Sequence, residues 1–122
     1  MFQVLTNNPK AYSWWLEKES TKMQVHWQEG GFNAVLIAAR DLVHRGWRLL
    51  NHPLSSSIKP NQTPYKTLVL AEGTELDCQS LSVIEAAIAT AKKLGDFPGA
   101  TQSIIEDLQF MDLEMCREIP LQ

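Results

Sequence analysis

Residues 47–71 read WRLLNHPLSSSIKPNQTPYKTLVLA, and this stretch decides how the sheet is built. A short apolar run, 47–50, precedes a long polar loop, 51–66, and a second apolar run, 67–71, follows. Both runs have the composition of buried strands. The loop between them is long enough for either a parallel crossover or an antiparallel return. We favour the parallel arrangement, because strands and helices alternate elsewhere along the chain.

The loop is rich in residues that position polar groups. It holds one His, three consecutive Ser, two Lys, one Tyr and three of the six Pro in the chain, and it has no Gly. Because each proline fixes its φ angle, the loop is expected to be a stiff support for its polar side chains. Long loops in compact domains are more often functional than incidental. The sequence therefore places the candidate site here.

The rest of the chain alternates between short apolar runs and amphipathic stretches. Strands are expected at 2–6 and 23–28, and the strict polar–apolar alternation of the second predicts an edge position. Helices are expected at 9–20, 32–45, 78–94 and from 102 onward, with Asn8, Asp77 and Thr101 as N-caps. This order predicts an α/β protein, a three-layer αβα sandwich. Its mainly parallel, Rossmann-like four-stranded sheet would have the order 2-1-3-4.

Length and composition bound the class of protein. A chain of 122 residues is expected to form one domain, 1–122, that is stable without a disulfide or metal. Hydrophobic residues make up 44% and charged residues 20%, as in ordinary globular proteins, and no apolar run is long enough to cross a bilayer. The N-terminus lacks a signal-like pattern, so a cytoplasmic location is expected.

Cysteine and histidine spacing gives no sign of a metal. Cys78 and Cys116 are far apart and are expected to be reduced thiols near helix surfaces. Histidines at 26, 44 and 52 do not have the spacing of metal ligands. No metal site and no cofactor is therefore predicted.

Charge is distributed unevenly along the chain. Residues 1–66 carry eight Lys or Arg against four Asp or Glu, whereas residues 67–122 carry three against ten. The loop lies in the basic half, which favours an anionic ligand there. The net charge is -3 and basic residues do not cluster with aromatic ones, so nucleic acid is not an expected partner. The last helix has a face expected in solvent, made of Glu106, Asp107, Asp112, Glu114 and Glu118.

The predicted sheet places a binding site at the carboxyl ends of its strands. Ligands bind there in open parallel sheets, where the strand order reverses. In the predicted order, the turn after the first strand faces the start of the loop. Hydroxyl, amide and ammonium groups beside a helix N-terminus suit a phosphate or carboxylate. The predicted ligand-binding residues are Asn7, Asn8, His52, Ser55, Ser57, Lys59 and Tyr65.

These residues also have ordinary structural roles. Asn7 and Asn8 are common turn and cap residues, and the serines can satisfy loop backbone groups. Lysines 59 and 66 are most often solvated. None of the serines lies in a GxSxG elbow, so a hydrolase nucleophile is not expected. His52 is a weak candidate for a general acid or base, because the sequence supplies no obvious titratable partner nearby. Catalytic residues are therefore unassigned, and whether the chain is an enzyme stays open.

The segment from His52 to Lys66 resembles the GrdX family, small proteins associated with glycine reductase gene clusters in anaerobic amino-acid fermenters. The stretches 6–9, 41–46 and 77–85 are also similar to that family. Ser56 stands where the family often has Gly. The resemblance implies a cytoplasmic accessory protein of glycine or betaine reductase metabolism, and it transfers no catalytic residues.

Three functions remain as alternatives. The first is an accessory protein that binds a small anionic metabolite at the carboxyl ends of the strands. The second is a small transferase or hydrolase that uses His52 as acid or base. The third is an interaction module that docks on a reductase subunit through the acidic last helix or an apolar patch. Neither a membrane nor nucleic acid is expected as a partner, and the sequence gives no oligomeric state.

Overall fold

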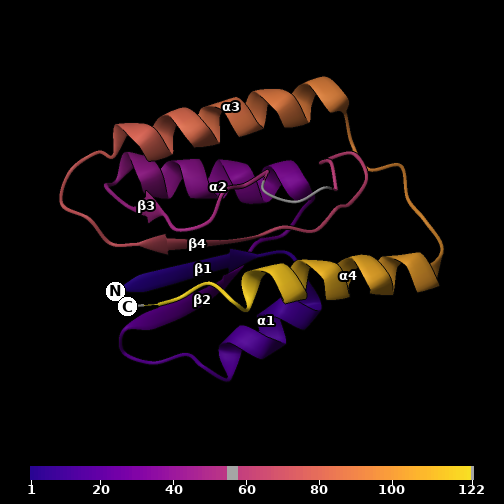
Figure 1. Cartoon of the computed structure of the whole chain (residues 1–122), viewed down its shortest axis with the longest axis horizontal. Coiled ribbons are helices and arrows are strands. Elements are labelled where there is room, and N and C mark those ends of the chain that lie inside the picture. Colours follow the sequence, from indigo (N-terminus) through magenta and orange to yellow (C-terminus); the bar gives the residue numbers. More distant parts are fainter. Residues whose placement is uncertain (55–57, 122) are drawn as a thin grey trace.

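A computed structural model of the chain describes residues 1–54 and 58–121. Figure 1 shows the helices and strands in chain order. They are β1 (Phe2–Thr6), α1 (Pro9–Leu16), β2 (Met23–Trp27), α2 (Phe32–His44), β3 (Arg48–Leu49), β4 (Thr67–Ala71), α3 (Cys78–Leu94) and α4 (Gln102–Cys116). The elements expected from the sequence are therefore present, and α1 ends earlier than predicted.

The strands form a mixed sheet in the order β2-β1-β4-β3. β1 is parallel to β2 but antiparallel to β4, and β4 is also antiparallel to β3. The predicted mainly parallel, Rossmann-like sheet of order 2-1-3-4 is therefore wrong. The long loop makes an antiparallel return, which inserts β4 between β1 and β3.

The burial of the two strands explains this order. All five residues of β4 are buried, so the strand needs neighbours on both sides and helices on both faces. β3 has only two paired residues, neither of them buried, and it lies at the edge. β2 occupies the opposite edge, with Met23 and Val25 buried and the residues between and after them exposed. That edge position confirms the prediction from its alternating pattern.

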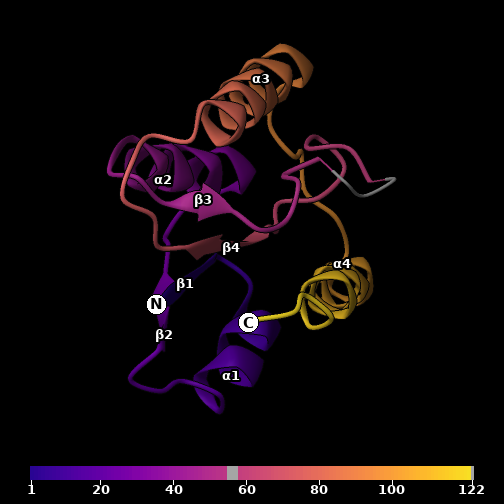
Figure 2. The same cartoon turned by 60° about the vertical axis from the view of Figure 1, so that its left-hand side comes forward.

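Helices cover both faces of the sheet (Figures 1 and 2). α2 packs on one face with α3 outside it, and α1 and α4 cover the other face. The alternation of side chains in β4 divides the core in the same way. Leu68 and Leu70 contribute to the cluster beneath α2, whereas Val69 contributes to the cluster with α1 and α4.

Three of the helices begin at the predicted caps. The side chains of Asn8, Asp77 and Thr101 accept hydrogen bonds from backbone N–H groups in the first turns of α1, α3 and α4. α2 is different, because its N-cap is Gly31 and no side chain caps it. The first N–H groups of α2 thus remain available to another partner.

Candidate functional site

The candidate site lies at one rim of the sheet, where polar segments meet the ends of the strands. Because β1, β2 and β3 run in one direction and β4 runs in the other, the carboxyl ends of three strands share a rim with the start of β4. The end of the long loop, rather than its start, consequently lies beside the turn that follows β1. This arrangement differs from the predicted one, in which β1 and β3 were neighbours.

Asn7 joins three segments at this rim. Its Nδ2 donates to the carbonyl oxygens of Pro64, at 2.7 Å, and Gly30, at 3.0 Å. Its Oδ1 accepts from the backbone N–H of Lys66 at 2.9 Å. Because both polar atoms of this buried side chain are engaged, Asn7 fixes the loop to the sheet in this structure.

A second set of hydrogen bonds attaches α4 to the rim. The carboxylate of Asp112 accepts from Asn8 Nδ2 at 2.9 Å, and from Thr67 through its N–H at 3.1 Å and its Oγ1 at 2.7 Å. Thr67 Oγ1 also lies 2.7 Å from Thr6 Oγ1. The network therefore connects β1, β4, α4 and the cap of α1.

The solvent-facing position predicted for Asp112 is wrong. Leu108 and Cys116 are the buried residues of α4, and Asp112 stands four residues from each. Residues at this spacing share a helix face, so the pattern placed Asp112 inward despite its charge. Neighbouring Thr67 and Asn8 supply the hydrogen bonds that make this position favourable.

Lys66 is likewise buried, although lysines of this loop were expected in solvent. It is 6% exposed, and burial lowers the pKa of its ammonium group, while the charge of Asp112 acts in the opposite direction. Among the residues that the structure describes, its Nζ takes part in no hydrogen bond or ion pair. The side chain lines a small hollow between the loop and α4, which we call the lysine hollow. Its other walls are Phe32, Pro53, Ile58, Thr63, Tyr65, Leu108, Met111, Asp112 and Met115.

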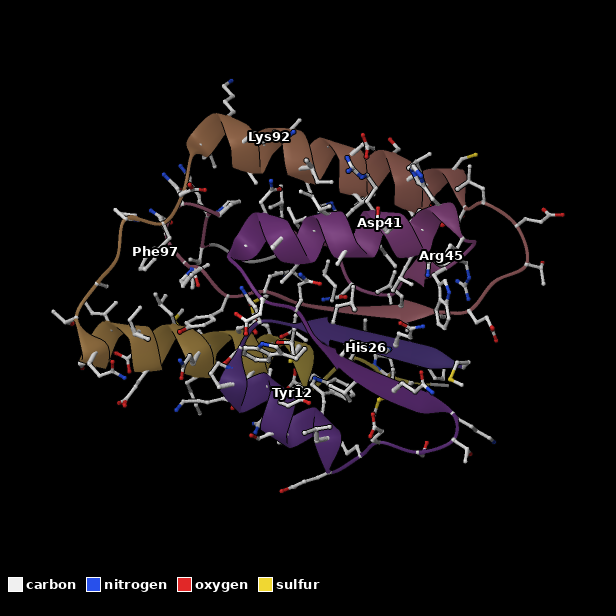
Figure 3. All side chains as sticks on the ribbon, turned by 180° about the vertical axis from the view of Figure 1, so that it is seen from behind. Tyr12, His26, Asp41, Arg45, Lys92 and Phe97 are labelled. Atoms are coloured by element: carbon white, nitrogen blue, oxygen red, sulfur yellow. The ribbon has the colours of Figure 1, made fainter. Side chains whose placement is uncertain are left out.

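A larger cavity, the rim cavity, opens where the loop crosses the start of α2. It encloses about 270 Å³. It is lined by Gly31, Phe32, Asn33 and Ala34 at the start of α2, by Pro60, Thr63 and Pro64 of the loop, and by Ala91, Gly95, Asp96 and Phe97. Figure 3 shows Phe97 on the segment that descends from α3, close to the start of α2. Phe32 and Thr63 line both cavities, so the two adjoin.

The start of α2 presents unpaired polar groups to the rim cavity. In the described part of the chain, no hydrogen bond uses the N–H of Phe32 or of Asn33. The Oδ1 atom of Asn33 is buried and also has no partner among the described residues. Free N–H groups and the positive end of the helix dipole attract an anion, and an unpaired carbonyl oxygen attracts a donor.

The remaining predicted residues are spread around the loop. Tyr65 lines the lysine hollow, where its hydroxyl accepts from Gln109 Nε2 at 2.8 Å. Lys59 is exposed. Ser55 and Ser57 lie outside the residues that the structure describes.

His52 faces a different part of the surface. It is exposed, its Nδ1 accepts from the N–H of Leu54 at 3.0 Å, and it borders a hollow of about 310 Å³ beside β3. Within the described ranges, no titratable side chain bonds to its imidazole. The structure thus brings Asn7, Asn8 and Tyr65 to one rim and places His52 beside β3. Lys59 is exposed between Ile58 and Pro60, which line the two cavities.

The cysteines are free thiols with different surroundings. Cys78 is exposed as expected, but Cys116 is buried, which corrects its predicted place near a helix surface. Its Sγ lies 3.3 Å from the indole N–H of Trp15, and burial raises the pKa of the thiol to about 11. Cys116 is therefore a packing residue with little thiolate at neutral pH.

The match to a known family covers almost the whole chain. A family model described as GrdX-like protein matches residues 3–119. No curated protein and no solved structure matches the chain. In the described ranges, none of the helices has the length and apolar character needed to span a membrane.

Proposed function

Since the chain belongs to the GrdX-like protein family, we propose that it is an accessory protein of glycine or betaine reductase-type amino-acid fermentation. The family membership suggests an association with glycine reductase systems. We propose further that the accessory role depends on a small anionic metabolite bound in the rim cavity, at the carboxyl ends of β1 and β2.

The uncapped start of α2 is the observation that carries this proposal. Gly31 supplies no side chain to the first turn, and the N–H groups of Phe32 and Asn33 are unpaired in the described structure. An anion at this position would accept hydrogen bonds from these groups and interact favourably with the helix dipole. Side chains cap the other three helices, so among the described helix starts the one at the rim cavity offers an anion the most favourable hydrogen bonds.

The walls of the rim cavity restrict the ligand. Its 270 Å³ falls just below the range of about 300–1,000 Å³ that is usual for small-molecule sites. Asp96 lines the cavity and would repel a second negative charge. A small metabolite with one negative charge fits these conditions best.

Substitution of Gly31 tests the proposal. Its φ of -89° and ψ of -164° suit other residues, and an added Cβ would meet no atom within 4 Å. Gly31→Asp would place a carboxylate on the free N–H groups and take the position of the anion, whereas Gly31→Ala would leave them free. We expect acetate or glycine to raise the melting temperature of the wild-type chain and of Gly31→Ala, but not that of Gly31→Asp.

The size of the effect can be estimated. A ligand at a hundred times its Kd stabilises a folded chain by about 2.7 kcal/mol. Without ligand, Gly31→Asp should be more stable than Gly31→Ala by about 1 kcal/mol, because the carboxylate caps the helix. A wild-type chain that responds to none of these anions, or a Gly31→Asp chain that responds as the wild type does, would refute the rim cavity as an anion site.

A second role is favoured by the surface of α4. Ile104, Phe110, Met111 and Met115 are between 43% and 54% exposed, an unusual group of large apolar side chains on one helix. We propose that a reductase subunit covers this surface.

Phe110→Asp should reduce retention of purified reductase subunits on the immobilised chain by about tenfold, as for a residue inside an interface. Leu76→Asp, at a residue 48% exposed before α3, is the matched control and should change nothing. Equal retention by both variants would show that the α4 surface is not the docking site of a reductase subunit.

A further inference from the structure

The side chain of Lys66 is almost fully buried, and it forms no direct ion pair with any described residue. The side chain is 6% exposed, and no hydrogen bond or ion pair reaches its Nζ from the described residues. Long ammonium side chains are almost never buried unless they are paired. An amine at the end of a buried side chain, with no hydrogen-bond partner among the described residues, is available for chemistry.

The lysine hollow has the surroundings of a reactive amine. Six of its walls are apolar side chains: Phe32, Pro53, Ile58, Leu108, Met111 and Met115. Removal from water disfavours the ammonium form and lowers the pKa of Lys66, so more of the neutral amine is present at neutral pH. Desolvated lysines of this kind form Schiff bases with carbonyl compounds in other proteins.

Two polar groups in the same hollow can assist such a reaction. The hydroxyl of Tyr65 accepts from Gln109 Nε2, which leaves its own proton free to be donated. The carboxylate of Asp112 accepts three hydrogen bonds and supplies negative charge near the amine. The hollow thus combines a nucleophile, a proton donor and an anion.

We infer that Lys66 is a nucleophilic amine that condenses with a small uncharged aldehyde in the lysine hollow. The nitrogen lone pair attacks the carbonyl carbon, and the carbonyl oxygen takes up a proton to give a carbinolamine. A second proton transfer releases the oxygen as water and leaves a carbon–nitrogen double bond. The product is an iminium ion, formed from one amine, one aldehyde and one proton, and Asp112 offsets its charge. This chemistry is separate from anion binding in the rim cavity.

The size of the hollow limits the aldehyde. It encloses about 20 Å³, which is room for about one water molecule. Met111 and Met115 on its α4 side are 43% and 44% exposed, and methionine side chains rearrange readily around a guest. Aldehydes of about two carbon atoms or fewer are therefore the expected partners once the methionines move, and larger or charged carbonyl compounds are not.

Reductive trapping tests this inference on the full chain. The chain is incubated with acetaldehyde and cyanoborohydride at neutral pH, and peptide mass spectrometry follows ethylation at each lysine over time. We expect Lys66 to be ethylated about tenfold faster than Lys59, an exposed lysine of the same loop. The advantage should shrink as the pH rises toward 10.5, the ordinary pKa of lysine, because the exposed amines then become neutral as well.

Variants separate the site from general lysine reactivity. Lys66→Met should abolish the fast ethylation seen at residue 66, and Lys59→Met should retain it. Melting temperatures confirm that both variants fold. Ethylation of Lys66 no faster than that of Lys59 in the wild-type chain would overturn the inference, whether or not Lys66→Met folds. Gly31→Asp should leave the fast ethylation intact, so a failure here can be told apart from a failure of the anion site.

Discussion

Single residues at the rim have structural roles that their residue types do not suggest. Asn7 uses both polar atoms of its side chain to join the loop, β1 and the turn after β2. Lys66 contributes a buried amine, and Asp112 contributes a carboxylate that accepts three hydrogen bonds. These contacts cross 23 positions or more of the chain, so no local pattern could reveal them. The spacing of Asp112 with Leu108 and Cys116 was the one available signal.

The buried charge of Lys66 should appear in the pH dependence of stability. Its pKa is lowered in the folded chain but is close to 10.5 in the unfolded chain, so the unfolded chain binds more protons between these two values. Stability conferred through this residue is therefore lowest below the folded-state pKa and rises with pH toward 10.5.

Comparison with Lys66→Met isolates this effect. The variant should be more stable than the wild type at neutral pH, and the difference should shrink as the pH rises toward 10.5. Lys59→Met should change stability by no more than about 0.5 kcal/mol at any pH. Urea unfolding across this pH range measures both, and a constant difference for Lys66→Met would contradict the buried-charge account.

At the scale of the element, the sequence predicted helices better than sheet pairing. The caps Asn8, Asp77 and Thr101 act locally, within three residues of the groups they bind, and all three are confirmed. The position of β4 depends on burial on both faces and on which strands remain for it to pair with. Strand order is a property of the assembled sheet. The sequence of an apolar strand has the same pattern whether its neighbour is parallel or antiparallel, so the pattern does not predict the pairing.

α4 should be the element most sensitive to loss of the rim network. Asp112→Ala removes the acceptor for Asn8 Nδ2 and for both Thr67 donors, at a cost of about 3 kcal/mol. Amide hydrogen exchange should therefore become faster in α4 and at Thr67, while the amides of α2 and α3 stay protected.

An exposed acidic residue of α4 serves as the control. Asp107→Ala lies on the same helix but on its exposed side, and exchange should be unchanged there. Uniform acceleration of exchange in the Asp112→Ala chain would show that the carboxylate supports the entire fold and not the attachment of α4.

For the whole molecule, the prediction named the long loop and the turn after β1, but it had the start of the loop rather than its end beside that turn. The carboxyl ends of β1 and β2, the long loop and a helix N-terminus do meet at one rim. The predicted ligand residues Asn7 and Asn8 are engaged in internal hydrogen bonds, and His52 lies apart beside β3. Among the described residues, Phe32, Asn33 and Lys66 carry the unpaired groups instead. Unpaired groups are recognised only when every other partner is known, and a sequence does not give that.

The insertion of β4 between β1 and β3 has a consequence for synthesis of the chain. When the ribosome has made the first 66 residues, β1 can pair with β2. The other edge of β1 remains unpaired, because its partner β4 has not yet been translated. A nascent chain of this length exposes apolar strand edges that invite pairing with other polypeptides. Stalled or truncated translation products should therefore aggregate, and the sheet closes only when residues 67–71 leave the exit tunnel.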